Sequence, residues 1–334
     1  MEKFSNGLTL FFSLLVEAIP FLLIGVAFSS LLLFFVNERA LIKFLPKTPL
    51  LGALAGSLMG VFFPVCECGN VPVARRLILQ GAPTSVSIGF LLAAPTVNPV
   101  VFWATWIAFR DQPEMVFLRV GFTLLIAVTI AWVFSHQRDM RPLLQASVAR
   151  QMPKLHPPVA PVNPLLRSGT FLIQADGTTL KLDDPAAQSL LASTPSQPMA
   201  IKLQLAIDNM VQELKELGAV LVMGSAIAAF VQVAAPREWI LALGQNFVTS
   251  ILAMMLLAAV VSICSTVDAF FALSFASTFT TGSQLAFLVF GPMIDLKNIG
   301  LLLTVFKPRA IFYIFVLAAQ LCFILTLFMN FYVS

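Results

Sequence analysis

Long apolar segments, separated by short polar ones, dominate this sequence. A helix needs about 20 apolar residues to cross the hydrocarbon core of a bilayer. Of the 334 residues, 59% are hydrophobic and only 11% are charged, whereas a soluble domain carries about 25% charged residues. The composition excludes a soluble or disordered chain and predicts an all-α polytopic membrane protein with about eight transmembrane helices. The expected spans are 8–36, 49–80, 83–110, 115–135, 207–235, 247–280, 284–306 and 309–333.

The apolar segments fall into two groups on either side of a polar linker. We expect a first membrane half at 1–135, a soluble linker at 136–206 and a second membrane half at 207–334. Proline and basic residues are concentrated in the linker, which is typical of a solvent-exposed connection. The stretch 170–182 surrounds Asp176-Gly177 and predicts a small β-hairpin within it.

The two halves resemble each other, which predicts an internal repeat of four helices each. Matching residues lie 196–199 positions apart, and the offset is almost constant along the halves. An even number of crossings per half would make the repeats parallel, whereas a re-entrant segment in each half would make them inverted. The matching pairs are Glu17 with Glu216, Gly25 with Gly224, Cys68 with Cys264, Pro95 with Pro292, Asn98 with Asp295, and Phe109 with Phe306.

Several of the predicted spans are interrupted by proline and glycine. Breaks are expected at Pro64 and Pro72, at Pro95 and Pro99, and at Gly291-Pro292. Such breaks are tolerated at membrane depth only where the freed backbone groups are buried in protein or line a cavity. A re-entrant hairpin over 70–94 is an alternative to two plain helices.

Orientation in the membrane stays open from the sequence. Basic residues occur in the short loops on one predicted face and in the linker on the other. The positive-inside rule counts short loops more strongly, but the linker is close to the length at which that discount applies.

Three cysteines are candidate ligands for a soft metal or metalloid. Cys66 and Cys68 flank Glu67 at a helix break, and Cys264 occupies the matching position of the second half. Thiolates bind soft ions; a trivalent arsenical with one organic group needs two thiolates, and a bare one accepts three. The alternative is that these cysteines are small apolar packing residues.

Ionisable residues at membrane depth are the second group of candidates. A charge at the bilayer centre costs on the order of 2.5–3.5 kcal/mol on insertion scales, so such residues should face an internal cavity. We predict proton coupling by Glu17, Glu67, Asp268 and Glu216, with static ion pairing as the alternative. The full set is Glu17, Glu67, Arg75, Arg76, Glu213, Glu216, Asp268, Asp295 and Lys297.

Polar residues at the helix breaks complete the predicted substrate site, because broken helices present backbone groups to a substrate near the midplane. Capping of half-helices without a ligand is an equally good interpretation of these side chains. The predicted substrate-binding residues are Cys66, Cys68, Asn70, Asn98, Cys264, Asp268 and Asp295.

Motifs of several other protein classes are absent from the sequence. There is no Gly-Lys dipeptide for a P-loop and no H-E-x-x-H, so neither an ATPase nor a membrane zinc protease is expected. The net charge of +4 does not indicate nucleic-acid binding and suits a membrane surface better. We expect no enzyme activity and no cofactor; the partners are the lipid bilayer and a small solute, and a homodimer is compatible with the sequence.

The residues around the breaks resemble a known family. The stretch from Pro64 to Ala74, Gly81, and the stretch from Phe90 to Pro99 are similar to the first-half signature of a bacterial permease family. Residues 262–270 and 291–297 are similar to its second motif. The family includes organoarsenical exporters (ArsP) and many YraQ-like permeases, and the resemblance covers both membrane halves but not the linker. Many relatives have serine where this chain has Glu67.

This resemblance implies a multi-pass permease of the bacterial inner membrane. Efflux of trivalent organoarsenicals is known for some members, so we expect a secondary transporter that exports a soft metalloid, an organoarsenical or a related small solute. The extra carboxylate of Glu67 could favour a metal cation over a neutral arsenical. Two alternatives are a membrane thiol oxidoreductase that uses Cys66 and Cys68, and a non-transporting subunit that docks a soluble partner through the linker.

Overall fold

The computed structural model describes residues 2–35, 46, 48–62, 67–137, 140–151, 171–173, 179–181, 199–234, 246–276 and 278–332. Before the linker the helices are α1 (Glu2–Phe35), α3 (Pro49–Leu58), η1 (Met59–Phe62), α4 (Glu67–Leu79), α5 (Thr84–Ala93), α6 (Pro99–Ala108) and α7 (Glu114–Ser135). After it they are α10 (Met199–Ala234), α12 (Phe247–Val261), α13 (Asp268–Leu273), α14 (Thr281–Met293), α15 (Leu296–Val305) and α16 (Pro308–Tyr332). The linker contributes α8 (Ala146–Gln151), β1 (Phe171–Ile173) and β2 (Thr179–Lys181).

Helices long and apolar enough to cross a membrane confirm the expected polytopic, helical character. Within the described residues there are 4 of them, at Ser5–Ala27, Glu114–Ser135, Thr281–Val305 and Pro308–Phe331. Shorter apolar helices lie within the predicted spans 49–80, 83–110 and 247–280, at Pro49–Phe62, Thr84–Ala93, Pro99–Ala108 and Val248–Val261. The predicted span 207–235 lies in α10, which is not among the four. The predicted number of eight spans is therefore not confirmed, because proline and glycine divide several apolar segments into pieces too short to cross alone.

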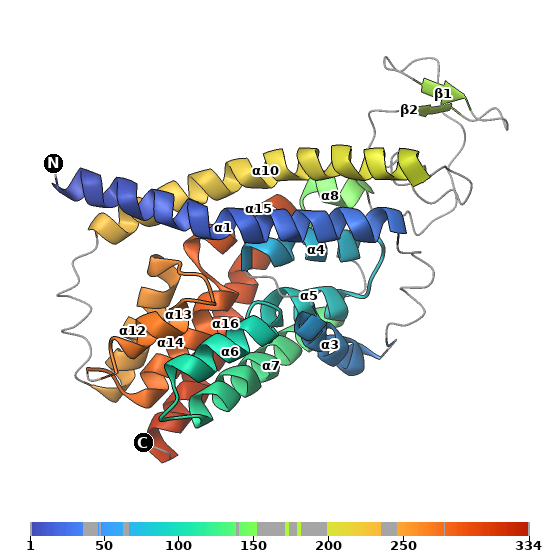
Figure 1. The fold of residues 1–334 in the computed structure, drawn as a ribbon. Coiled ribbons are helices and arrows are strands. Elements are labelled where there is room, and N and C mark those ends of the chain that lie inside the picture. The colour runs from blue at the N-terminus through green and yellow to red at the C-terminus, as the bar shows by residue number, and fades with distance from the viewer. Residues whose placement is uncertain are drawn as a thin grey trace.

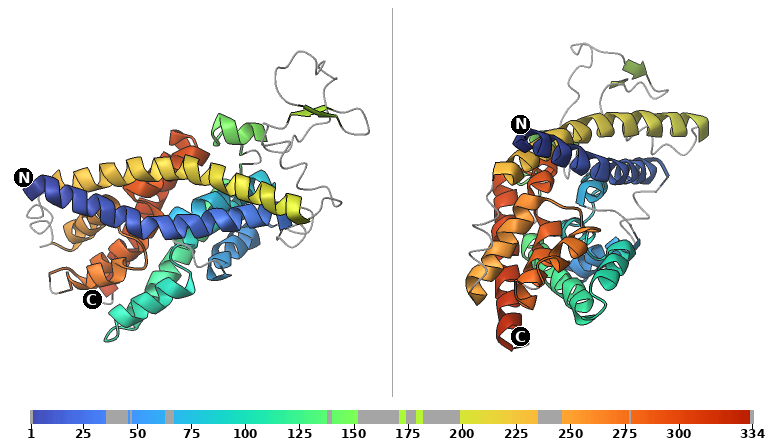
Figure 2. Two further views of the ribbon diagram at one scale, coloured as in Figure 1. Left: turned by 45° about the horizontal axis from the view of Figure 1, so that its top comes forward. Right: turned by 60° about the vertical axis from the view of Figure 1, so that its left-hand side comes forward.

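Two long helices, α1 and α10, lie side by side across one end of the other helices (Figure 1). They run in opposite directions, which both further views also show (Figure 2). The outer face of this pair is apolar: Val16 is 72% exposed and Phe230 75% exposed. Such side chains suit contact with lipid tails better than contact with water.

The remaining helices lie beneath this pair in two groups, one from before the linker and one from after it. In Figure 1, α3, α5, α6 and α7 lie together, and α12, α13, α14 and α16 lie beside them. The two groups meet where α7 packs against α14 and α16 and where α13 packs against α6. Below the pair, α4 contacts α1 and α15, and α15 also contacts α10.

Proline and polar caps determine where the short helices begin. Pro99 opens α6, a position that suits proline because the missing N–H would have no partner there. The Val101 N–H donates to Asn98 Oδ1 (2.9 Å) at the start of this helix. In α15 the Asn298 N–H donates to Asp295 Oδ1 (2.6 Å). The predicted breaks at Pro95–Pro99 and at Gly291-Pro292 therefore each end at a capped helix start. The break predicted at Pro72 does not occur, because Pro72 lies inside α4, and Pro64 lies outside the described residues.

Parts of the predicted linker belong to the packed structure. Met140, Leu144 and Val148 are buried, and the Gln145 N–H donates to the Val305 carbonyl at the end of α15 (2.9 Å). Helix α10 begins at Met199 rather than near 207, so its first two turns lie within the range predicted as linker. Strands β1 and β2 pair in antiparallel register, with Phe171 opposite Lys181, at the position of the predicted hairpin.

Candidate functional site

Ion pairs connect residues that precede the linker with residues that follow it. Among the described side chains three such pairs occur, and every one joins the N-terminal half (residues 1–135) to the C-terminal half (residues 207–334). Arg75 pairs with Glu216 at 3.1 Å, Arg119 with Asp268 at 2.6 Å, and Lys297 with Glu67 at 3.9 Å. The ion pairs between described side chains thus all lie at the contact between the halves.

Two of these ion pairs are fully buried and belong to one group of side chains. The Glu67 and Lys297 side chains are both 0% exposed. Lys297 also interacts electrostatically with Cys68, Asp295 and Cys264, and Glu67 interacts with Asp268 and Asp295. We call this group the buried polar centre: Glu67, Cys68, Arg119, Cys264, Asp268, Asp295 and Lys297.

Helix ends deliver most of these side chains to the centre. Glu67 and Cys68 open α4, Asp268 opens α13, and Asp295 caps α15. The short segment after α12 reaches α15 through Ser262, whose left-handed backbone (φ 50°) ends α12 and whose Oγ accepts from the Leu296 N–H (3.1 Å). Broken and capped helices therefore concentrate polar groups where unbroken helices would present an apolar surface.

Arg119 joins three elements of the two halves. Its guanidinium donates to Thr105 Oγ1 of α6 (2.7 Å) and to Asp268 Oδ2 of α13 (2.6 Å). It is 1% exposed, so the interaction with Asp268 is poorly screened.

Several buried polar atoms of the centre have no hydrogen-bond partner within the part of the chain that the structure describes. They include both carboxylate oxygens of Glu67, Lys297 Nζ, Asp268 Oδ1 and Asp295 Oδ2. Glu67 and Lys297 are close enough to attract each other but too far apart to form a hydrogen bond. Buried polar atoms are normally hydrogen-bonded, so this arrangement suits small polar ligands that supply donors and acceptors.

A family model described as "Predicted permease" matches residues 3–331. The chain belongs to this permease family. It is 39% identical over 304 residues to the UPF0718 protein YcgR of Bacillus subtilis (strain 168). This alignment covers 91% of this chain and 90% of that protein. It is 30% identical over 304 residues to the "Putative two-component membrane permease complex subunit" of Streptococcus mutans serotype c, covering 91% and 88%. No solved structure matches the chain significantly.

The structure describes two of the three predicted thiol ligands of the permease. Cys68 and Cys264 are free and buried, and the Thr266 hydroxyl donates to Cys264 Sγ (3.6 Å). Cys66 lies outside the described residues. Within the part of the chain that the structure describes, no group of three or more His, Cys, Asp or Glu side chains could hold a metal ion, so a site of three thiols stays a prediction.

The other predicted site residues have different surroundings. Asn70 is buried and donates to the Leu91 carbonyl (2.6 Å), and Asn98 caps α6. Glu216 pairs with Arg75 at the periphery, where its side chain is 47% exposed. The side chain of Glu17 lies outside what the structure describes. The structure therefore brings Glu67, Cys68, Cys264, Asp268 and Asp295 together, whereas Asn70, Asn98 and Glu216 make contacts of their own.

Arg119 is the centre residue that sequence reasoning missed. It is the one charged residue in the predicted span 115–135 of the permease. A lone arginine in an apolar span requires a buried partner, and this signal would have found it.

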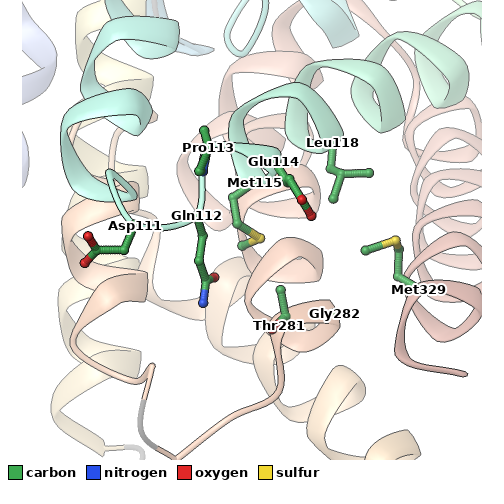
Figure 3. A pocket seen from close by; sticks show the side chains of 9 residues that line it. All are labelled: Asp111, Gln112, Pro113, Glu114, Met115, Leu118, Thr281, Gly282 and Met329. Carbon is green, nitrogen blue, oxygen red and sulfur yellow. The ribbon is translucent and has the colours of Figure 1, made fainter. Parts of the chain in front are cut away.

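A separate pocket of about 260 Å³ lies at the opposite end of α14 from Asp295. The loop between α6 and α7 and the start of α7 form one side, and the start of α14 with Met329 of α16 forms the other (Figure 3). It is lined by Asp111, Gln112, Pro113, Glu114, Met115, Leu118, Thr281, Gly282 and Met329. Like the buried polar centre, this pocket lies between the two halves of the permease.

Proposed function

We propose that this permease is a secondary transporter of the bacterial inner membrane that exports a soft metalloid, an organoarsenical or a related small solute. The substrate would bind at the buried polar centre. The observation that carries the proposal is the position of Lys297, which interacts with both Cys68 and Cys264. Two thiols from different halves therefore lie around one buried charge.

The arrangement of matching helices supports a transport cycle. The bounds of α6 (Pro99–Ala108) and α15 (Leu296–Val305) differ by 197 residues at both ends. The matching long helices α1 and α10 are antiparallel (Figure 1), and so are α7 and α16. Two halves related by such an inversion can open alternately to the two sides of a membrane while the site between them is kept. Inverted rather than parallel repeats form part of this proposal.

The chemistry of the centre fits a soft, polar solute. Thiol groups select soft ions and metalloids, while the unpartnered oxygens and Lys297 Nζ can bind hydroxyl groups on the same solute. Cys66, two residues before Cys68, would add a third thiol. The carboxylates of the centre would carry the coupling protons.

Cellular resistance to trivalent organoarsenicals tests this proposal. In a sensitive bacterial host, we expect the wild-type chain to raise the tolerated concentration, and Cys66→Ser, Cys68→Ser and Cys264→Ser to abolish the gain. Cys322→Ser is the matched control, because Cys322 is buried in α16 and contacts the Ala286 carbonyl instead (3.8 Å). Equal resistance of all four variants at equal expression would refute substrate binding by these thiols.

A non-transporting subunit is the second candidate, favoured by the name of the Streptococcus relative and by the docked linker. The Lys307 N–H donates to the Leu143 carbonyl (2.8 Å), so the linker is tied to the helix that carries Asp295. Deleting residues 170–182 distinguishes the candidates: a transporter should retain resistance, whereas a subunit that docks a partner there should lose its activity. No described feature favours a thiol oxidoreductase.

A further inference from the structure

Two matching helix starts in this chain are capped by different residues. Asn98 caps α6 and Asp295 caps α15, each through Oδ1 and the N–H three residues later (2.9 and 2.6 Å). Because a neutral asparagine makes the same cap in the first half, capping does not require the negative charge of Asp295. That charge needs another explanation.

A second charge accompanies Asp295 in the same half. The position that matches Lys297 is Val100, so both charges occur in α15 and neither occurs in α6. Asp295 and Lys297 are 1% and 0% exposed. Two buried charges that the matching helix lacks point to a role in function rather than in folding.

The described charges of the buried polar centre do not balance. Arg119 is bonded to Asp268, which leaves Lys297 between Glu67 and Asp295. One ammonium cannot neutralise two carboxylates. The excess negative charge lies where a charge is costly, and a bound proton would remove it.

We propose that Asp295 is the proton-carrying residue of the transport cycle, with Lys297 as its partner. This inference rests on the proposed function and deepens it. Protonation occurs at Asp295 Oδ2, which has no hydrogen-bond partner among the described residues, while Oδ1 keeps the cap on α15. Lys297 then neutralises Glu67 alone; when Asp295 releases the proton to water on the open side, Lys297 is shared by both carboxylates.

The groups around Asp295 support this assignment to a single residue. From α4 the charged neighbour of Asp295 is Glu67. Its partner Lys297 also interacts with Cys68 of α4 and with Cys264 of the segment after α12. Asp268 of α13 faces Glu67 but is bonded to Arg119. On the α10 side, Gly224 faces the Lys297 backbone, and Lys307, before α16, lies beyond the far end of α15 and donates from Nζ to the Pro142 carbonyl.

Proton binding at Asp295 would act directly on the contact between the halves. Lys297 and Glu67 come from different halves and lie 3.9 Å apart without a hydrogen bond. A change in the charge of Asp295 strengthens or weakens this loose ion pair, so protonation and movement of the halves are linked.

Infrared titration of the purified, membrane-reconstituted full chain tests the proposal. The carboxylic C=O band of a protonated buried carboxyl should be present at low pH and should fall as the pH rises. We expect Asp295→Asn to remove this band and to keep the cap, as Asn98 does. Asp111→Asn is the matched control, because Asp111 is exposed, and it should leave the band unchanged. Lys297→Met should instead increase the band, since both Glu67 and Asp295 then lack a cation.

Each of three results would overturn the proposal. The first is an unchanged band in Asp295→Asn, and the second is the absence of any titrating band in the wild-type chain. The third is loss of the band on replacing choline chloride by sodium chloride at fixed pH, which would make the residue a sodium ligand. The titration needs no transported solute, so it can fail while organoarsenical resistance persists, and the proposed function can fail while the band behaves as expected.

Discussion

At the scale of single residues, Arg119 is the clearest link between the halves. Its guanidinium contacts the Thr105 hydroxyl and the Asp268 carboxylate, and the ion pair is only 1% and 3% exposed. Removing one partner of a buried ion pair leaves an uncompensated charge, whereas removing both leaves none.

We therefore expect Arg119→Gln to lower the free energy of unfolding in detergent by about 3–5 kcal/mol. The double variant Arg119→Gln with Asp268→Asn should recover most of this loss. Thermal unfolding followed by tryptophan fluorescence measures the effect, with Arg110→Gln, at an exposed position, as the control. Additive losses in the double variant would show that the two charges do not depend on each other.

The sequence could indicate which residues carry charge at depth, but not which of them pair. Asp268 and Asp295 were predicted because each is acidic within an apolar run. The partner of Asp268 is 149 residues away in sequence, and only the packing of α7 against the second half brings it close. Pairing over such a separation depends on tertiary structure, which local pattern does not encode.

At the scale of elements, Gly25 of α1 determines how closely α4 can approach α1. A Cβ added at Gly25 would overlap the backbone of Gly69 in α4. At Gly218, in α10, a Cβ would meet no atom within 4 Å. The two glycines therefore predict opposite outcomes for the same substitution.

Gly25→Ala should separate α1 from α4, lower the melting temperature and displace Glu67 and Cys68 from the centre. Gly218→Ala should be neutral or stabilising by up to about 1 kcal/mol, because alanine is the better helix former. Measuring the melting temperature and the organoarsenical resistance of each variant checks both predictions. Equal melting temperatures for the two variants would contradict the close α1–α4 contact.

Helix breaks were predictable and helix lengths were not. Proline and glycine are strong local signals, so the breaks at Pro95–Asn98 and Pro292–Asp295 followed from sequence. The start of α10 at Met199 lies within the range predicted as linker, because a helix can extend past the apolar run that faces lipid. Within 49–80 the break expected at Pro72 was wrong, since α4 continues through this proline where it packs against α1 and α15.

At the scale of the whole molecule, the linker and the helix that carries Asp295 form one unit. Gln145 Nε2 donates to the Leu303 carbonyl (3.0 Å) and the Lys307 N–H to the Leu143 carbonyl (2.8 Å). Leu144, between these contacts, is completely buried. If α15 moves in the proposed transport cycle, residues 140–151 should move with it.

Two halves that meet at a buried polar centre explain why the most deeply buried charges among the described residues come together. All three ion pairs between described residues cross from one half to the other, and the two most buried lie at the centre with Cys68 and Cys264. If the substrate binds there, it must contact residues from both halves. Binding by one half alone would not link substrate to movement.

Equilibrium binding of phenylarsine oxide to the purified chain tests most directly whether the two halves share one substrate site. We expect the wild-type chain and Cys322→Ser to bind the arsenical, and Cys68→Ser and Cys264→Ser each to lose most of the affinity, because each removes a thiol contributed by a different half. Retained affinity in the Cys264→Ser variant would contradict a substrate site shared between the two halves.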